Sequence, residues 1–251
     1  MYFQNATSTL QNVEIKNNIA YSGAGIRSVN SNLVMSNMDF NNNNAQDSGY
    51  LDAYAQGGGL RISQYSDVII ASSDIQNNSG RFGGGIFSDN SSTIKLLNVN
   101  LESNSATIDV DGNIEGSALY ISDSDLDIIN SSAQGNTGAC IDCNTNSIGS
   151  FYTEFGSNIN VVNSIFWNES LNTELSVSNV DQGTGVPDIS ITYSDIRGGF
   201  AGEGNINVTP QFIPANSGDP NAWYNDFDSS TSNIGIGGGS KILPFPTDID
   251  F

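Results

Sequence analysis

Four oxygen-bearing side chains are spaced so that they could bind one hard cation. The sequence contains a D-x-D-x-N-x-E run, formed by Asp109, Asp111, Asn113 and Glu115. Alternating carboxylate and amide oxygens are ligands that Ca²⁺ prefers. The run departs from the full calcium-loop pattern, because the glycine precedes the asparagine and a distal bidentate glutamate has no clear counterpart. Calcium is therefore expected as an optional ligand, and no cofactor is required.

The absence of histidine limits the catalytic chemistry that the chain can perform. None of the 251 residues is a histidine. Ser-His-Asp and Cys-His arrangements are thereby excluded, and so are most zinc sites. Catalysis would have to depend on carboxylates, tyrosine or one of the few basic residues. The sequence leaves an enzymatic role open and favours a non-catalytic one.

Cys140 and Cys143 are the only cysteines, in a C-x-x-C spacing. The spacing is compatible with a local disulfide, a buried thiol beside an exposed one, a metal pair or a redox motif. A thioredoxin-type motif opens a helix, which is not predicted here, and a metal pair would lack further thiolate or imidazole ligands. We expect a small disulfide or inert structural cysteines, as suits an exported protein.

An internal repeat determines where these residues lie. Six asparagines, each three positions after an apolar or small residue, recur at intervals of 25 to 35 residues: Asn18, Asn43, Asn78, Asn104, Asn136 and Asn168. A glycine-rich step before a short alternating strand is the second landmark, as in Gly57-Gly58-Gly59 before Leu60. The pattern predicts an all-β fold, a right-handed parallel β-helix solenoid of about seven coils.

The asparagines have a structural task in such a solenoid. An amide that faces into the coil can bond to the same amide one coil above and below, and asparagine tolerates the left-handed backbone of a sharp turn. We expect an internal ladder. Residues 1–199 should form the coils. Residues 200–251 should form an irregular cap of the same domain, because five of the six prolines lie there, together with Trp223, Tyr224 and Phe227.

Two coils carry long segments at the same corner, between the ladder asparagine and the next strand. These segments are residues 46–56 and 107–116. Stacking would align rings and a guanidinium along this edge, from Tyr21, Tyr50, Tyr54, Arg81 and Phe82. Rings near carboxylates suit a neutral glycan, by stacking against C–H faces and bonding to hydroxyls. Plain solvated loops are the alternative.

Two repeat units resemble a known group of proteins. They are residues 57–63 with 74–78, and residues 83–90 with 98–104. They are similar to the repeats of secreted bacterial right-handed β-helix proteins, which are pectate-lyase-like in shape and include polymorphic outer-membrane-protein-type repeats. The resemblance covers residues 1 to about 215. It implies this fold and a cell-surface habit, and it specifies no reaction.

Charge narrows the choice of partners. The net charge of −20, from seven basic and 27 acidic residues, opposes binding to nucleic acid and to anionic membranes. It also weakens the case for a polyuronate, because uronate lyases of similar fold need Lys or Arg beside the uronate. Neutral glycans, divalent cations and cationic surfaces stay open.

The termini bear on location. No signal peptide or spanning run is present, and Met1 to Asn5 match the strand that follows a glycine step in other coils. We expect a fragment of a longer exported protein, at the cell surface or outside the cell. Exposed strand edges would favour end-to-end self-association.

The sequence thus predicts a structural or adhesive module that contacts an extracellular glycan or protein without catalysis. The alternative is a polysaccharide-active enzyme of the same fold, a glycoside hydrolase or lyase, which would use Asp109, Asp111, Glu115 or a nearby carboxylate as acid and base.

Overall fold

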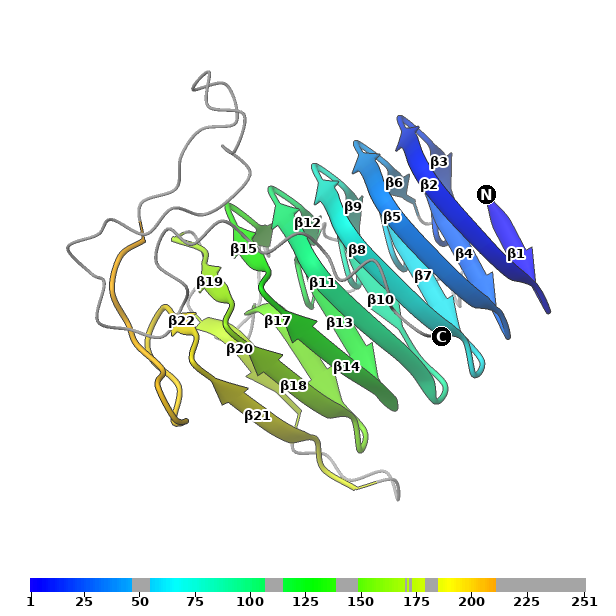
Figure 1. The fold of residues 1–251 in the computed structure, drawn as a ribbon. Helices are drawn as coiled ribbons and strands as arrows, with labels where there is room; N and C mark the ends of the chain where they lie inside the picture. Colours follow the sequence, from blue (N-terminus) through cyan, green and yellow to red (C-terminus); the bar gives the residue numbers. More distant parts are fainter. Residues whose placement is uncertain are drawn as a thin grey trace.

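A computed structural model describes residues 1–46, 55–106, 115–138, 149–169, 171, 173–178 and 185–210 of the chain. These residues form strands and turns, with no helix among them, and all strand pairs are parallel. Successive coils stack along one axis, as Figure 1 shows. The predicted parallel β-helix is confirmed. Within these ranges no helix has the length and apolar character needed to cross a membrane.

Three parallel sheets run along the stack. The first five coils contribute to all three, and the last two contribute to sheets A and B. Sheet A contains β1 (Tyr2–Gln4), β4 (Ile26–Val29), β7 (Leu60–Ser63), β10 (Ile86–Ser88), β13 (Leu119–Ser122), β17 (Gly149–Glu154) and β20 (Thr173–Val177). Seven strands correspond to seven coils in the described ranges, as the repeat predicts.

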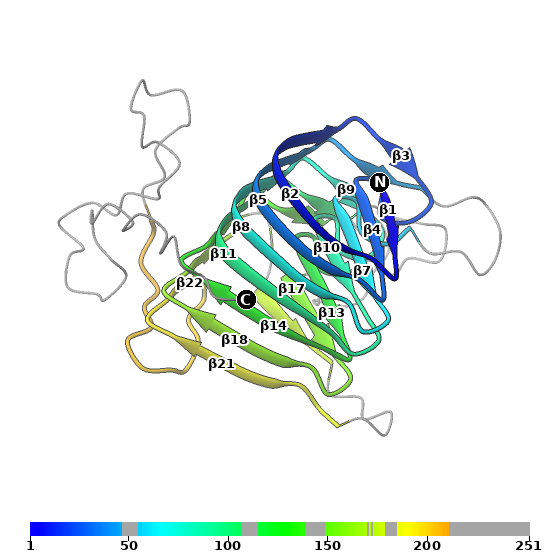
Figure 2. The same cartoon turned by 45° about the vertical axis from the view of Figure 1, so that its right-hand side comes forward.

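Sheet B holds the longest strands and sheet C the shortest. Sheet B contains β2 (Thr7–Lys16), β5 (Asn32–Asn41), β8 (Asp67–Gln76), β11 (Ser92–Glu102), β14 (Ser124–Ile129), β15 (Ser132–Gln134), β18 (Asn158–Val162), β19 (Ile165–Trp167), β21 (Asp188–Thr192) and β22 (Asp195–Ile196). Sheet C contains β3 (Ile19–Ala20), β6 (Asn44–Ala45), β9 (Ser79–Gly80), β12 (Ser105–Ala106) and β16 (Thr137–Gly138). The three sheets surround a narrow interior (Figure 2).

The interior is filled by aliphatic side chains from alternate strand positions. In sheet A, Ile26, Leu60, Ile86 and Leu119 stand in register on neighbouring strands and are fully buried. Each side chain packs on the same position of the next coil, and burial of one such side chain contributes about 1.5 to 3 kcal/mol. Because the side-chain period of a strand is two, the residues at the intervening positions of each strand point outward.

The asparagine ladder is also confirmed. The Nδ2 group of each ladder residue donates to the Oδ1 atom of the next, at 2.8 to 3.1 Å from Asn18 to Asn168. The Nδ2 group of Asn43 also donates to the Ile15 carbonyl at 2.8 Å. Its backbone N–H donates to Asn78 Oδ1 at 3.0 Å. From Asn43 onward the ladder residues are fully buried, and their polar atoms are paired.

The left-handed corner residue is not the ladder asparagine, contrary to expectation. It is the residue before it, with φ values of 57° at Asn17, 56° at Asn42 and 55° at Asn77. The reason is geometric: the preceding residue makes the turn, and the ladder residue can then direct its amide into the coil. An asparagine in the left-handed region has a small penalty.

Serine ladders support two further corners, which the sequence analysis did not predict. In one, the backbone N–H of each serine donates to the Oγ atom of the next coil's serine, along Ser31, Ser66, Ser92, Ser124 and Ser157. The second runs along Ser131, Ser164 and Ser194. Each hydroxyl donates to a carbonyl of its own coil, so both of its roles are used.

The glycine step brings sheet C close to sheet A. A Cβ atom at Gly84 would collide with the carbonyl oxygens of Ser105 and Ser117. A glycine is therefore required at this position for close approach of adjacent coils.

A glutamate ends the ladder near the last coils. Glu174 accepts from the Asn168 backbone N–H at 2.6 Å, from Asn168 Nδ2 at 2.7 Å and from Ser150 Oγ at 2.9 Å. Glu174 is 2% exposed. Burial raises the pKa of its carboxyl, and these hydrogen bonds oppose the shift. Glu174 thus takes the place that the next asparagine would occupy.

Candidate functional site: the outer face of sheet A

The outward positions of sheet A form one continuous column. Strand register aligns Tyr2, Arg27, Arg61, Phe87, Tyr120, Tyr152 and Ser176, one residue from each coil. From Arg27 to Ser176, each follows by one position a residue that packs in the interior, so strand alternation directs it outward. The column is basic in its first half and aromatic in its second.

The aromatic half is a stack of rings. The centroids of Phe87 and Tyr120 lie 5.0 Å apart with an interplanar angle of 19°, and those of Tyr120 and Tyr152 lie 4.9 Å apart at 29°. Phe82 meets the Tyr120 ring edge-on, with a centroid distance of 5.3 Å. The rings cover one another's faces and are 4%, 8% and 9% exposed at Phe87, Tyr120 and Tyr152, so they form a packed cluster and not a stacking platform for a ligand.

Two glutamates complete the cluster of polar groups beside these rings. The Tyr120 hydroxyl donates to Glu154 Oε1 at 2.5 Å, and the Tyr152 hydroxyl donates to Glu154 Oε2 at 3.3 Å. Burial raises the pKa of the Glu115 carboxyl to about 7, and the charge of Glu154 adds to the shift, while a hydrogen bond with Tyr152 opposes it. Burial, followed by the charge of Glu154, also raises the pKa of Tyr120. At neutral pH the tyrosine hydroxyls are therefore protonated and donate to Glu154, whereas the Glu115 carboxyl, with its pKa near 7, exists in both its protonated and its ionised form.

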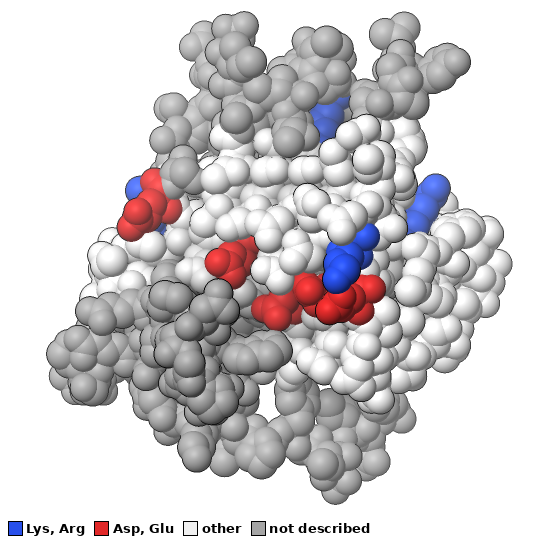
Figure 3. Space-filling model, turned by 90° about the horizontal axis from the view of Figure 1, so that it is seen from above, with Lys and Arg blue, Asp and Glu red and all other residues white. Residues whose placement is uncertain are grey.

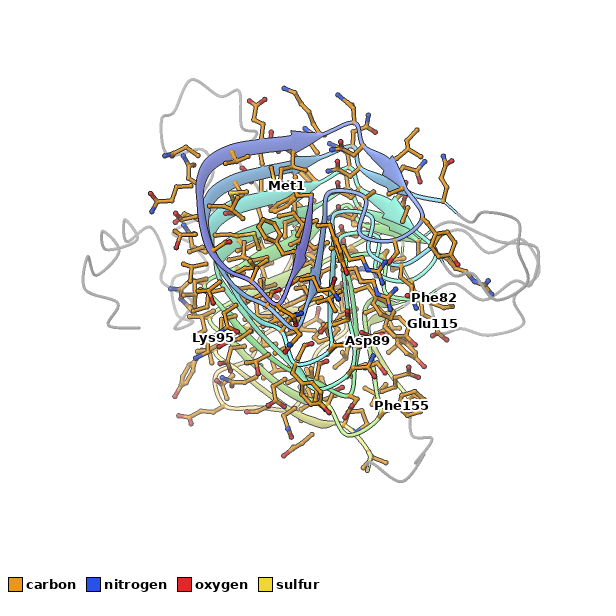
Figure 4. The ribbon with its side chains drawn as sticks, turned by 90° about the vertical axis from the view of Figure 1, so that its right-hand side faces the viewer. Met1, Phe82, Asp89, Lys95, Glu115 and Phe155 are labelled. Carbon is orange, nitrogen blue, oxygen red and sulfur yellow. The ribbon has the colours of Figure 1, made fainter. Side chains whose placement is uncertain are left out.

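Backbone bridges at the corner next to sheet A place Glu115 in this cluster. Ser22, Gln56, Phe82 and Glu115 pair in succession as parallel bridges of adjacent coils. Viewed along the stack in Figure 4, Phe82 and Glu115 lie together on one side, and Lys95 lies on the opposite side. The corner thus adds one ring and one carboxylate to the column.

The structure brings some of the predicted site residues together. Arg81 is 4% exposed, and its guanidinium carbon lies 5.1 Å from the Phe82 ring centroid, so it acts as a buried support. Tyr21 precedes Ser22 at the same corner of the first coil and is 38% exposed. Whether these residues contact a glycan stays a prediction.

Other predicted residues lie outside the described ranges. They are Tyr50, Tyr54, Asp109, Asp111, Asn113, Cys140, Cys143, Trp223, Tyr224 and Phe227. Among the residues that are described, no three His, Cys, Asp or Glu side chains form a group that could hold a metal ion. Calcium binding by the 109–115 run therefore stays a prediction.

The sequence analysis missed Arg27, Arg61, Tyr120, Tyr152 and Glu154. A signal for the first three was present, because each directly follows the strand-start residue of its coil: Ile26, Leu60 or Leu119. Alignment of the coils by strand phase would have placed them on one outward column. Glu154 could not be found in this way, because it joins the cluster through hydroxyls from two different coils.

The outer face of sheet B differs from this face. A shallow groove of about 520 Å³ lies over β11, β14, β18 and β21. Its polar side chains form exposed pairs, such as Asn158 Nδ2 with Asp125 Oδ1 at 2.7 Å and Lys95 with Asp127 at 3.9 Å. Pairs of this kind contribute about 1 kcal/mol or less. Figure 3 shows another view of the surface, in which acidic side chains gather beside a basic one amid mostly uncharged residues.

The fold and this face define the chain as a parallel β-helix with one outward aromatic and polar column. No protein-family model and no curated protein matches the chain. The assignment of a role therefore depends on the geometry of the face.

Proposed function

We propose that the chain is a structural or adhesive module of an exported bacterial surface protein, and that the outer face of sheet A contacts a glycan without catalysis. The observation that carries this proposal is the network of Glu115, Tyr152, Glu154 and Tyr120. It stands on and beside outward positions of sheet A, where Tyr120 and Tyr152 are 8% and 9% exposed and Glu115 and Glu154 are partly exposed, so the two carboxyls are the groups of the network that a ligand can reach.

The network has unused capacity for hydrogen bonding. A carboxylate offers about four acceptor sites, and Glu154 uses two of them for tyrosine hydroxyls. The remaining sites can accept from the hydroxyls of a neutral sugar. Partial burial raises the pKa of the Glu115 carboxyl to about 7, and perturbed groups of this kind concentrate at functional sites.

Rigid placement favours binding as well. The hydroxyls and Glu154 stand on strands of sheet A, whose register is fixed on both sides by neighbouring coils. Groups on strands are held more precisely than groups on loops. The surface location rests on the resemblance of the repeats to those of secreted β-helix proteins. With the charge of −20, we expect neither nucleic acid nor membrane insertion.

Affinity electrophoresis tests this proposal. The purified chain is run through gels that contain neutral polysaccharides, with calcium and with chelator. We expect one glycan to retard the wild type and Glu154→Gln to lower the affinity about tenfold, because a hydrogen bond to a charged group is lost.

Asp127→Asn is the matched control. It makes the same change of charge on the outer face of sheet B, and we expect retardation to be retained. Equal losses in both variants, or no retardation of the wild type by any neutral glycan, would contradict the proposal. A calcium requirement for retardation would support the predicted metal site.

A second function is favoured by one specific observation. Glu115, with its pKa raised to about 7, lies beside Glu154, and a pair of carboxyls in unequal environments can supply a general acid and a general base. If the chain is a polysaccharide-active enzyme, it should release reducing ends from the retarding glycan. Glu115→Gln should then abolish release and lower retardation by less than Glu154→Gln does. Retardation without release leaves the binding module as the better description.

A further inference from the structure

Two arginines occupy neighbouring positions on the outer face of sheet A. In the parallel pair of β4 and β7, Arg27 stands opposite Arg61. Like charges directly opposite each other on one face of a sheet are destabilising. Since the chain has only seven basic residues, the abundance of arginine does not explain this pairing.

Arg61 is fixed by contacts within the chain. Its Nη2 group donates to Asp89 Oδ2 at 3.2 Å, and its Nη1 group donates to Ser22 Oγ at 3.0 Å. The guanidinium carbon lies 5.5 Å from the Phe87 ring centroid. These contacts use two of the five N–H donors and hold the plane of the guanidinium.

Arg27 has no comparable hydrogen-bond partners among the described residues. In the described ranges its side chain makes no hydrogen bond, and its guanidinium carbon lies 5.6 Å from the Tyr2 ring centroid. Six buried side-chain polar atoms of the described residues have no hydrogen-bond partner, and three of them belong to this cluster: Arg27 Nε, Arg61 Nε and Asp89 Oδ1. The two Nε atoms are donors without an acceptor, which is costly, so an acceptor supplied by a ligand would stabilise the arginine pair, whereas Asp89 Oδ1 is itself an acceptor and would not bind an anion.

We propose that Arg27 and Arg61 form a subsite for an oxyanion, a carboxylate or sulfate group, carried by an acidic sugar unit of a glycan on sheet A. Two guanidinium forks on adjacent strands can donate to both oxygens of a planar carboxylate, or to several oxygens of a sulfate. Tyr2 and Phe87 lie against the guanidinium groups and favour their orientation. The inference rests on the proposed function only in that the anion belongs to a glycan.

The acidity of the chain does not prevent this binding. Among the described residues, Arg61 and Arg27 carry two positive charges against the one carboxylate of Asp89, which pairs with Arg61 and interacts electrostatically with Arg27, so the subsite is locally cationic. Carboxylates elsewhere on the surface are screened beyond a Debye length, which is about 8 Å at physiological ionic strength. Glu115 and Glu154 stand further along the column, beside β13 and β17.

Matched polymers test the subsite by affinity electrophoresis at physiological ionic strength. Carboxymethyl cellulose is compared with the neutral hydroxyethyl cellulose, and dextran sulfate with dextran. We expect the wild type to be retarded more by the anionic member of a pair. Arg27→Gln should lower this excess affinity about tenfold or more and leave the neutral polymer unaffected.

Lys95→Gln is the control, because it removes one positive charge on the opposite side of the coil (Figure 4). It should keep the excess affinity. Arg27→Lys retains the charge and loses the planar fork, so it should keep only part of the excess affinity for the anionic polymer. An excess for carboxymethyl cellulose alone identifies a carboxylate site, and an excess for both anionic polymers identifies a general oxyanion site.

Two outcomes overturn the subsite. They are equal loss in Arg27→Gln and Lys95→Gln, which indicates net charge alone, and the absence of any excess in the wild type. Retardation by neutral glycans without an anionic excess would keep the proposed function and remove the subsite. An anionic excess without any retardation by neutral glycans would keep the subsite and contradict the binding of neutral glycans by the network.

Discussion

The asparagine ladder and the outer face of sheet A bury polar groups in opposite ways. In the ladder, the side-chain amide of each residue from Asn43 to Asn136 uses its donors and its acceptor in hydrogen bonds with the coils before and after it. On the outer face, Glu154 and Arg27 keep hydrogen-bonding capacity that the described chain does not use. Polar groups whose bonding is exhausted stabilise the fold, whereas those with capacity left can bind a ligand.

Glu174 and Glu154 repeat this contrast with the same residue type. Glu174 receives three donors within the stack, on both of its oxygens. Glu154 receives two from tyrosine hydroxyls and stays partly exposed. Equal substitutions at such pairs of positions should therefore separate stability from binding.

The largest effect is expected from Asn104→Ala. The change removes a buried amide that donates to the Ile75 carbonyl and to Asn136 and that accepts from the N–H and Nδ2 of Asn78. Buried groups left unpaired cost about 1 to 3 kcal/mol each. We expect the free energy of unfolding to fall by about 3 to 5 kcal/mol in urea titrations.

Asn158→Ala is the control for Asn104→Ala. Asn158 is exposed on sheet B and bonds to Asp125 at 2.7 Å. Its loss should cost about 1 kcal/mol or less. Similar losses in the two variants would mean that the ladder contributes no more than a surface pair.

Glu174→Gln should have the next largest effect. The amide nitrogen of glutamine would face a donor, because both oxygens of Glu174 accept hydrogen bonds. We expect a loss of about 1 to 3 kcal/mol in the free energy of unfolding. Glu154→Gln should change the stability by less than about 1 kcal/mol and act on glycan retardation instead. Equal loss of stability in both variants would erase the distinction between the two regions.

The fold was predictable because its signals are local. The two-residue alternation of Leu60 and Ile62 depends only on neighbours in the same coil, and the ladder asparagines recur once in each of six coils, so both signals can be recognised along the sequence. The serine ladders escaped prediction because serine occurs at many turns, and the partner that gives Ser66 its role lies one coil away. Phe82 and Glu115 were expected on one edge, but the hydroxyls of Tyr120 and Tyr152 join them only through a register that spans loops of unequal length.

The smallest effect should come from the titration of Glu115. Its pKa rises from 4.5 to about 7 in the folded chain, through burial and then the charge of Glu154. The folded state therefore holds more protons than the unfolded state between these values, so the contribution of this group to stability falls as the pH rises from about 4.5 to 7. Asp74 and Asp195, whose pKa values burial raises to about 6, add slopes of the same sign, and Glu174, whose pKa is also raised, acts in the same direction.

Only a difference between variants can isolate Glu115 from these other groups. We expect the melting temperature of the wild type to fall more steeply over this pH range than that of Glu115→Gln, by a few degrees in total, because partial exposure weakens the effect. Parallel pH profiles would show that Glu115 is solvated like the exposed pairs of sheet B. The outer face would then carry no carboxyl with a raised pKa, and the case for an acid and base pair there would fail.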